Sequence, residues 1–301
     1  MTASKRLVFF GNERLVSGLK RSDTPLLRGL IERGYDIAAV VVNNTEAVSR
    51  NARALEVAAV ASAHNIPVLS PNKPADIIDE LKNMHVDAAI LSAYGRIIPQ
   101  RVIDVFSPIG IINIHPSLLP RHRGSTPIET TILDGDTTAG VSIMQLTAGM
   151  DEGPVYNQVS MDLTGTETKF DLYATLSTTG AELLFDLLPT ILDGSLQPKP
   201  QSTTGVSYTT QVSKGNSFVD PTTESASTIE RKVRAYLGFP KTKIHYVGND
   251  VILTAAKVVD SLIEKEFCIT CAGNSTLLIE ELQAPNGKRM TGSAYLRGYM
   301  R

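Results

Sequence analysis

The chain has 301 residues, of which 42% are hydrophobic and 20% charged, with 29 basic against 31 acidic side chains. This composition excludes disordered, collagen-like and coiled-coil classes. No apolar run approaches the ~20 residues of a transmembrane helix, and the apolar stretch near the N-terminus is too short for a signal peptide, so we expect a cytoplasmic protein with no membrane partner. Two cysteines, Cys268 and Cys271, are too few for a disulfide framework or a zinc ribbon, and we expect no metal.

The first hundred residues alternate short apolar runs with longer amphipathic stretches, which is typical of strands and helices in a parallel sheet. Pro25 and Gly34 mark the two ends of the first helix. Strands are predicted at 7–10, 37–42, 68–69, 88–91 and 111–115, and helices at 24–31, 54–64 and 75–84. We therefore predict an α/β domain with a Rossmann-like, mostly parallel sheet and helices on both faces.

The second part of the chain changes character after a long predicted helix at 171–192. Residues 197–207 are rich in Ser, Thr, Pro and Gln and are predicted to link a catalytic domain at 1–196 to a second domain at 208–301. The second domain has a predicted helix at 226–236 and short strands at 244–247, 251–255, 266–269 and 277–281, which favour a small β-barrel-like (OB-type) fold. Residues 201–301 contain 12 Lys and Arg against 9 Asp and Glu, a weak indication of a polyanionic partner.

The densest polar cluster lies at residues 111–124, at the end of a predicted strand. Residues two apart on a strand point to the same side, so Asn113 and His115 share one face while two isoleucines occupy the other. Pro116 ends the strand. The pair is therefore predicted at the carboxyl edge of the sheet, where open α/β folds bind their ligands.

An amide and an imidazole at one edge can both donate hydrogen bonds to a carbonyl oxygen that becomes negative during acyl transfer. Asp151, in a Gly- and Pro-containing turn, could act as the base toward an attacking amine or stabilise a protonated His115. No Ser or Cys nucleophile is needed when the acyl donor is already activated. The alternative is a hydrogen-bonded Asn-x-His pair with no catalytic role.

These residues carry a family resemblance that is strongest over residues 85–195. Asn113-x-His115-Pro116-Ser117-Leu118-Leu119-Pro120, followed by Met150-Asp151-x-Gly153-Pro154, resembles the formyltransferases that use 10-formyltetrahydrofolate. The segments 121–128 and 135–145 look most like the members of that family that act on methionyl-tRNA, and the resemblance continues more weakly into 233–240 and 277–283.

The resemblance implies a role for each matching position. Asn113 and His115 would polarise the formyl oxygen, and Asp151 would be the acid/base partner. The folate co-substrate would bind to Arg96, Ile97, Ile98, Ser117, Leu118, Leu119 and Pro120. The expected reaction is formyl transfer to the α-amine of methionyl initiator tRNA by a monomeric enzyme, with the second domain contacting the tRNA.

Two departures from the family pattern concern the acceptor. The loop at 43–53 lacks the usual Pro, Gly and several basic residues, and leaves Arg50 and Arg53, with Arg121 and Arg123, as candidate tRNA contacts. Gly11-Asn12-Glu13-Arg14 replaces the usual Gly-Thr-Pro. A sugar-nucleotide N-formyltransferase is therefore an alternative, and a noncatalytic folate- or tRNA-binding protein is a second one.

Overall fold

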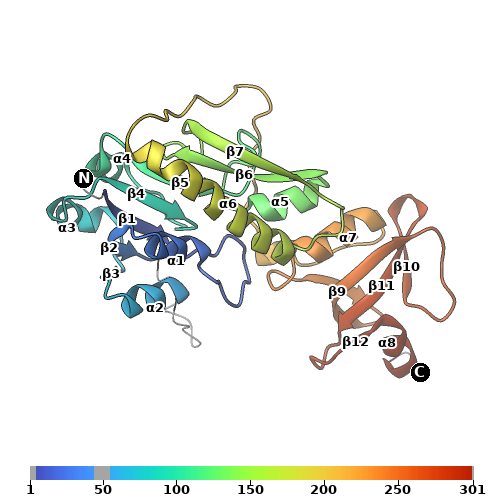
Figure 1. The fold of residues 1–301 in the computed structure, drawn as a ribbon. Coiled ribbons are helices and arrows are strands. Elements are labelled where there is room, and N and C mark those ends of the chain that lie inside the picture. Colours follow the sequence, from blue (N-terminus) through green and yellow to red (C-terminus); the bar gives the residue numbers. More distant parts are fainter. Residues whose placement is uncertain (1–4, 44–54, 300–301) are drawn as a thin grey trace.

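The computed structural model describes residues 5–43 and 55–299, and its N-terminal part is built on one seven-stranded sheet (Figure 1). The strand order is β3-β2-β1-β4-β5-β6-β7; the first five strands of this order are parallel, and β6 and β7 are antiparallel to their neighbours. The strands are β1 (Arg6–Gly11), β2 (Asp36–Val41), β3 (Val68–Leu69), β4 (Ala88–Ser92), β5 (Ile111–His115), β6 (Thr138–Gln145) and β7 (Val155–Asp162). The predicted mostly parallel sheet is confirmed.

Helices cover both faces of this sheet, as predicted (Figure 1). One face packs against α1 (Pro25–Glu32), α2 (Glu56–Ala63), α5 (Pro127–Asp134) and α6 (Lys169–Leu192). The other packs against η2 (Pro74–Ile77), α3 (Ile78–Asn83), α4 (Gln100–Ile103) and η3 (Asp104–Phe106). None of the helices in the described ranges is long and apolar enough to span a bilayer.

The alternation of β5 follows from these two cores. Ile112 and Ile114 are buried against the α6 side of the sheet, whereas Ile111 belongs to the core on the opposite side. Asn113 and His115 share the face of Ile111 and lie at the carboxyl end of the strand, where the apolar core stops. The hydrophobic pattern thus fixes the direction of both polar side chains.

The C-terminal part is a second, β-rich unit with its own core, as predicted. Its antiparallel sheet has the order β10-β11-β9-β8, with β12 paired to β11. The elements are η4 (Lys214–Asn216), α7 (Ala226–Ala235), β8 (Thr242–Tyr246), β9 (Asn249–Val259), β10 (Cys268–Cys271), η5 (Ala272–Asn274), β11 (Ser275–Gln283), β12 (Arg289–Thr291) and α8 (Gly292–Tyr299).

The two units meet at a tight joint near the N-terminus of α6. Gly18 has a positive φ, and a Cβ there would lie 2.8 Å from the carbonyl carbon of Gly238. Beside this contact, the buried Lys169 Nζ donates to the Phe239 carbonyl (2.8 Å) and lies 3.7 Å from Glu129 Oε1. The joint is therefore closed by direct backbone contact and by the hydrogen bond from Lys169 to Phe239, beside a buried ion pair.

Candidate functional site

A cavity of about 230 Å³ lies at the carboxyl ends of β4 and β5. It contains all three residues predicted to do the chemistry: Asn113 and His115 from β5, and Asp151 from the turn between β6 and β7. The remaining lining comes from Arg14, Leu15, Leu91, Ala93, Tyr94, Gly95, Ile114, Pro116, Gly124, Ser125 and Pro127. Side chains far apart in the sequence thus share one hollow.

His115 is fixed in direction by a backbone group. Its Nε2 lies 2.9 Å from the carbonyl oxygen of His122, and a carbonyl only accepts hydrogen bonds, so Nε2 carries the proton of this contact. Its Nδ1 lies 3.6 Å from Asp151 Oδ2. Nδ1 is therefore the nitrogen available to the cavity, and it can donate only when the ring is charged.

Asp151 is held inside a rigid turn. It has a left-handed backbone (φ 51°), and its Oδ2 accepts a hydrogen bond from the amide of Gly124 at 2.8 Å. Gln201 donates to the carbonyls of Asp151 and Gly153. A Cβ on Gly153 would lie 1.8 Å from the Gln145 carbonyl oxygen, so this position requires glycine. The turn is locked by contacts on both of its sides.

Asn113 is buried, and its side-chain amide has no hydrogen-bond partner within the described part of the chain. A buried amide without a partner keeps its donor for a ligand. Together with a charged His115 ring, it provides two donors near a carboxylate. This set can stabilise an oxyanion and handle a proton.

In the structure, the three side chains predicted to flank the folate ring, Arg96, Ile97 and Ile98, have different environments. Arg96 donates through Nε to Asn43 (2.7 Å) and contacts the carbonyls of Pro71 and Asn72, so its charge ties three loops together. Ile98 is buried in the core, while the side chain of Ile97 is 80% exposed two residues after Gly95, which lines the cavity. Of these three side chains, Ile97 is the one presented to solvent.

The second predicted folate segment, Ser117–Pro120, does not line this cavity. Its backbone is fastened to the sheet: Ser142 Oγ donates to the Ser117 carbonyl (2.6 Å) and accepts from the Leu119 amide (3.1 Å). Gln158 donates to the Leu119 carbonyl (2.8 Å). The side chain of Leu118 fills the space beside Gly140, where no Cβ would fit. In the structure the segment braces the wall behind His115.

Two of the four predicted tRNA contacts, Arg50 and Arg53, lie outside the described residues. Arg121 has a half-exposed side chain and pairs with Asp136 at 2.6 Å. The guanidinium of Arg123 is buried and donates to Gln201 (2.8 Å) and Tyr208 (3.1 Å). The Arg123 guanidinium is therefore engaged by Gln201 and Tyr208, with Glu152 Oε1 3.6 Å from its Nη1.

Sequence reasoning did not identify three residues that shape the site: Tyr94, His122 and Gln201. Tyr94 is buried, and its hydroxyl has no partner among the residues that the structure describes; burial raises the pKa of this hydroxyl. The Gln201 side chain donates to the backbone carbonyls of Asp151 and Gly153, whereas His122 contacts the His115 ring through its own backbone carbonyl. Of the three, Tyr94 had a usable signal in the sequence, because it lies three residues after the predicted strand 88–91.

A family model described as formyl transferase matches residues 14–188, and one described as formyl transferase, C-terminal domain, matches residues 211–300. A methionyl-tRNA formyltransferase from Lactobacillus acidophilus is 31% identical over 296 residues, covering 93% of each chain. One from Dechloromonas aromatica is 32% identical over 286 residues, covering 91% of each.

Solved structures share the fold at lower identity. An N-formyltransferase from Helicobacter canadensis, in complex with folinic acid and dTDP-3-aminofucose, has a TM-score of 0.68 at 16% identity, covering 91% of this chain and 98% of that one. HypX from Aquifex aeolicus in complex with tetrahydrofolic acid has a TM-score of 0.64 at 17% identity, covering 99% of this chain and 47% of that one.

Proposed function

The chain belongs to the formyl transferase family, and we propose that it transfers the formyl group of 10-formyltetrahydrofolate to the α-amine of methionyl initiator tRNA. The observation that carries this proposal is the meeting of Asn113, His115 and Asp151 in one cavity, with the His115 and Asp151 side chains 3.6 Å apart. Acceptor identity rests on the curated relatives.

The reaction needs no covalent intermediate on the protein. The neutral amine attacks the formyl carbon, the carbonyl π electrons move to oxygen, and a tetrahedral oxyanion forms. Asn113 donates its amide hydrogen to that oxygen, and His115 in its charged form donates from Nδ1. The bond from carbon to the folate nitrogen then breaks, and the proton lost by the amine is delivered to that nitrogen.

Asp151 has two tasks in this scheme. Its carboxylate faces His115 Nδ1, while the other ring nitrogen is already occupied by the His122 carbonyl. It also accepts the proton of the attacking amine on its way to the leaving nitrogen. The hydrogen bond from Gly124 keeps the carboxylate aimed at the imidazole during both steps.

The folate is proposed to lie along residues 95–98, which begin at the cavity wall and present Ile97 as an apolar surface for a flat ring. The Ser117–Pro120 segment, whose Ser117 and Leu119 are buried, would act by keeping the wall in shape. Arg96 and Ile98 would hold the backbone of the first segment, since their side chains are committed elsewhere.

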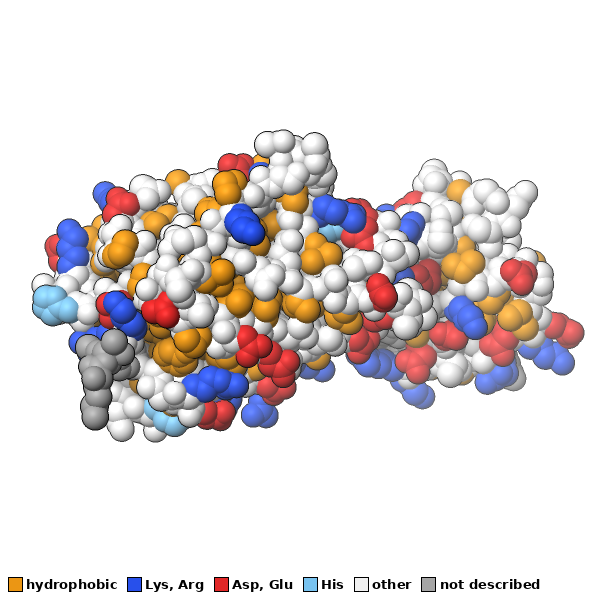
Figure 2. Space-filling view, turned by 45° about the horizontal axis from the view of Figure 1, so that its top comes forward, with side chains coloured by type: hydrophobic (Ala, Val, Ile, Leu, Met, Phe, Trp, Pro, Cys, Tyr) orange, Lys and Arg blue, Asp and Glu red, His pale blue; other side chains and the backbone are white. Residues whose placement is uncertain are grey.

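The tRNA is proposed to contact the C-terminal domain, Arg121 and the loop that carries Arg50 and Arg53. Figure 2 shows basic and acidic side chains interspersed over the C-terminal domain on the face in view, so phosphates would be met by separate Lys and Arg side chains there. Arg123 is proposed to hold residues 201–208 instead of a phosphate. A monomeric state and a cytoplasmic location stay predictions.

A competition of acceptors tests the proposal. The protein receives 10-formyltetrahydrofolate with a labelled formyl group and either methionyl initiator tRNA or a nucleotide-linked amino sugar. We expect label on the tRNA, with a rate that falls as salt concentration rises because phosphate contacts are screened. Label on the sugar alone would show that the acceptor is the amino sugar and not the tRNA. Label on neither would favour a binding protein. Asn113→Ala is the matched inactive control.

A further inference from the structure

One short segment holds both ionisable groups of the catalytic cavity. The carbonyl of His122 accepts from His115 Nε2 at 2.9 Å, and two residues later the amide of Gly124 donates to Asp151 Oδ2 at 2.8 Å. A shift of this segment would therefore move the imidazole and the carboxylate together. What fixes residues 122–124 also fixes the catalytic pair.

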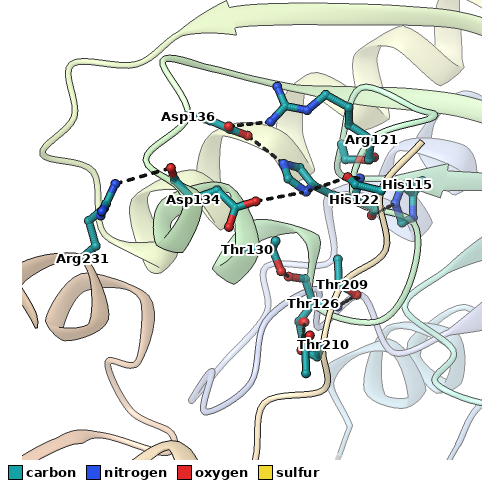
Figure 3. Close-up of polar contacts among 12 residues, drawn as sticks. His115, Arg121, His122, Thr126, Thr130, Asp134, Asp136, Thr209, Thr210 and Arg231 are labelled. Atoms are coloured by element: carbon teal, nitrogen blue, oxygen red, sulfur yellow. Dashed lines mark hydrogen bonds and ion pairs between the residues drawn. The ribbon is translucent and has the colours of Figure 1, made fainter. Parts of the chain in front are cut away.

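The side chain of His122 anchors this segment through its contact with Asp136. Its backbone is left-handed (φ 55°), a conformation that residues other than glycine adopt seldom and that needs support from the surrounding structure. The ring is 4% exposed, and Nε2 lies 2.7 Å from Asp136 Oδ2. Asp136 in turn accepts from Arg121 at 2.6 Å, and Figure 3 shows the ring of His122 reaching the carboxylates of Asp136 and Asp134.

Other charged groups around this ring are few and identifiable. Asp134 Oδ2 lies 3.9 Å from Nδ1 and its side chain is 53% exposed. Arg231 of the C-terminal domain donates to the backbone carbonyl of Asp134 at 3.4 Å. The short contact with Asp136 is thus the main polar restraint on the His122 ring, with Ser207 Oγ at 3.5 Å from Nδ1 as a weaker one.

The chain between the domains supplies a second anchor. Ser207 accepts from the His122 amide through Oγ and from the Arg123 amide through its carbonyl, both at 2.9 Å. The Thr209 amide donates to the Arg123 carbonyl at 2.7 Å. Residues 207–209 therefore run beside 122–123 and hold the segment from its other edge.

We propose that His122, through its hydrogen bond with Asp136, is a positioning residue that orients His115 for formyl transfer. This inference rests on the proposed function. The ring anchors the left-handed backbone, the backbone carbonyl holds Nε2–H of His115, and Nδ1 is thereby turned toward Asp151 and the formyl oxygen. Without the anchor the imidazole loses its fixed acceptor and can turn its proton away from the reacting atoms.

The test compares three variants of the full chain. Asp136→Ala removes the anchor and is expected to lower kcat about tenfold while KM for both substrates stays within about twofold. Asp134→Ala, which removes the more distant and exposed carboxylate, is the matched control and should retain the wild-type rate. His122→Asn keeps a residue that adopts the left-handed backbone readily but loses the ring contact with Asp136, so it should lower kcat to a similar extent as Asp136→Ala. A wild-type kcat in Asp136→Ala, or a change confined to KM, would overturn the proposal.

A spectroscopic readout makes the result independent of acceptor identity. The ¹⁵N chemical shifts of the His115 ring, followed to the pH at which it is neutral, should show the proton on Nε2 in the wild type and a mixture of the two tautomers in Asp136→Ala. A neutral wild-type ring protonated on Nδ1 would overturn the proposal. If the protein formylates neither acceptor while Nε2 is protonated, the proposed function fails and the positioning of His115 stands.

Discussion

A lysine is sealed inside the joint between the two domains, and its removal should be costly. Lys169 is 0% exposed; Nζ donates to the Phe239 carbonyl and to Ser17 Oγ (3.1 Å) and lies 3.7 Å from Glu129 Oε1. The other carboxylate oxygen of Glu129 has no partner among residues 5–43 and 55–299. Burial lowers the pKa of Lys169 to about 8, with Glu129 opposing the shift, so the ammonium is charged at pH 7.

Replacing Lys169 with Met keeps a long unbranched side chain and removes its charge. Two unit charges about 4 Å apart attract by about 4 kcal/mol at an effective dielectric constant near 20. Breaking a buried pair by deleting one partner costs about 3–5 kcal/mol, because the remaining charge stays buried without compensation. We expect Lys169→Met to lower the free energy of unfolding by this amount. Adding Glu129→Gln removes the uncompensated charge and should restore most of the loss.

Urea unfolding followed by circular dichroism at pH 7 measures the effect in the wild type, both single variants and the double variant. Lys82→Met, on the exposed side of α3, is the control and should change the free energy by at most about 0.5 kcal/mol. A loss below about 1 kcal/mol for Lys169→Met, or a double variant as unstable as the sum of the two singles, would refute the reasoning.

Three further predictions concern the catalytic cavity and the N-terminus of α1. Asn113→Ala should lower kcat by about a hundredfold with little change in KM, since it removes one oxyanion donor; near-normal turnover in a steady-state formylation assay would remove that role. Burial raises the pKa of Glu13 to about 7 against the amide hydrogen bonds of Leu26 and Leu27, so the folded state binds more protons than the unfolded state between about pH 4.5 and 7. Stability should therefore fall as pH rises through this window, by up to about 3 kcal/mol relative to Glu13→Gln, and a pH-independent difference in urea midpoints would contradict this. Tyr94→Phe removes a buried hydroxyl without a partner in the described residues and should raise the unfolding free energy by about 1 kcal/mol; a loss in the same denaturation assay would indicate an undetected partner.

The sheet and the orientation of its catalytic strand could be predicted because they depend on local alternation. The isoleucines of β5 identify both faces, and the predicted strand 111–115 has the bounds that the structure gives. Helix α6 was equally readable, since its apolar residues recur at helical spacing. The strands β6 and β7 were not predicted. The side chains of β7 are mostly half-buried or exposed, so it has little hydrophobic pattern, and its place depends on pairing with β6.

The contacts that shape the cavity join residues that are far apart in the sequence, and no local sequence pattern predicts such contacts. Ser207 and His122 are 85 residues apart, and Gln201 contacts Asp151 across 50 residues. The Ser117–Pro120 segment matched a family motif. The sequence could not show that Ser142 and Gln158 would form hydrogen bonds to its backbone carbonyls. Motifs indicated which residues matter, whereas the packing of neighbouring segments decides which atoms they present.

The pairing of residues 207–210 with the catalytic domain bears on how chimeric proteins should be assembled. Thr209 and Thr210 bond to Thr126 at the start of α5 (Figure 3). Ser207 bonds to His122 in the same stretch. A hybrid that joins the N-terminal domain of one relative to the C-terminal domain of another at residue 196 would exchange residues 207–210. The exchange would disturb the segment that holds the His115 imidazole. A crossover placed after Thr210 keeps residues 207–210 together with the N-terminal domain that they contact. Acceptor preference could then be exchanged between relatives without changing the contacts that position His115.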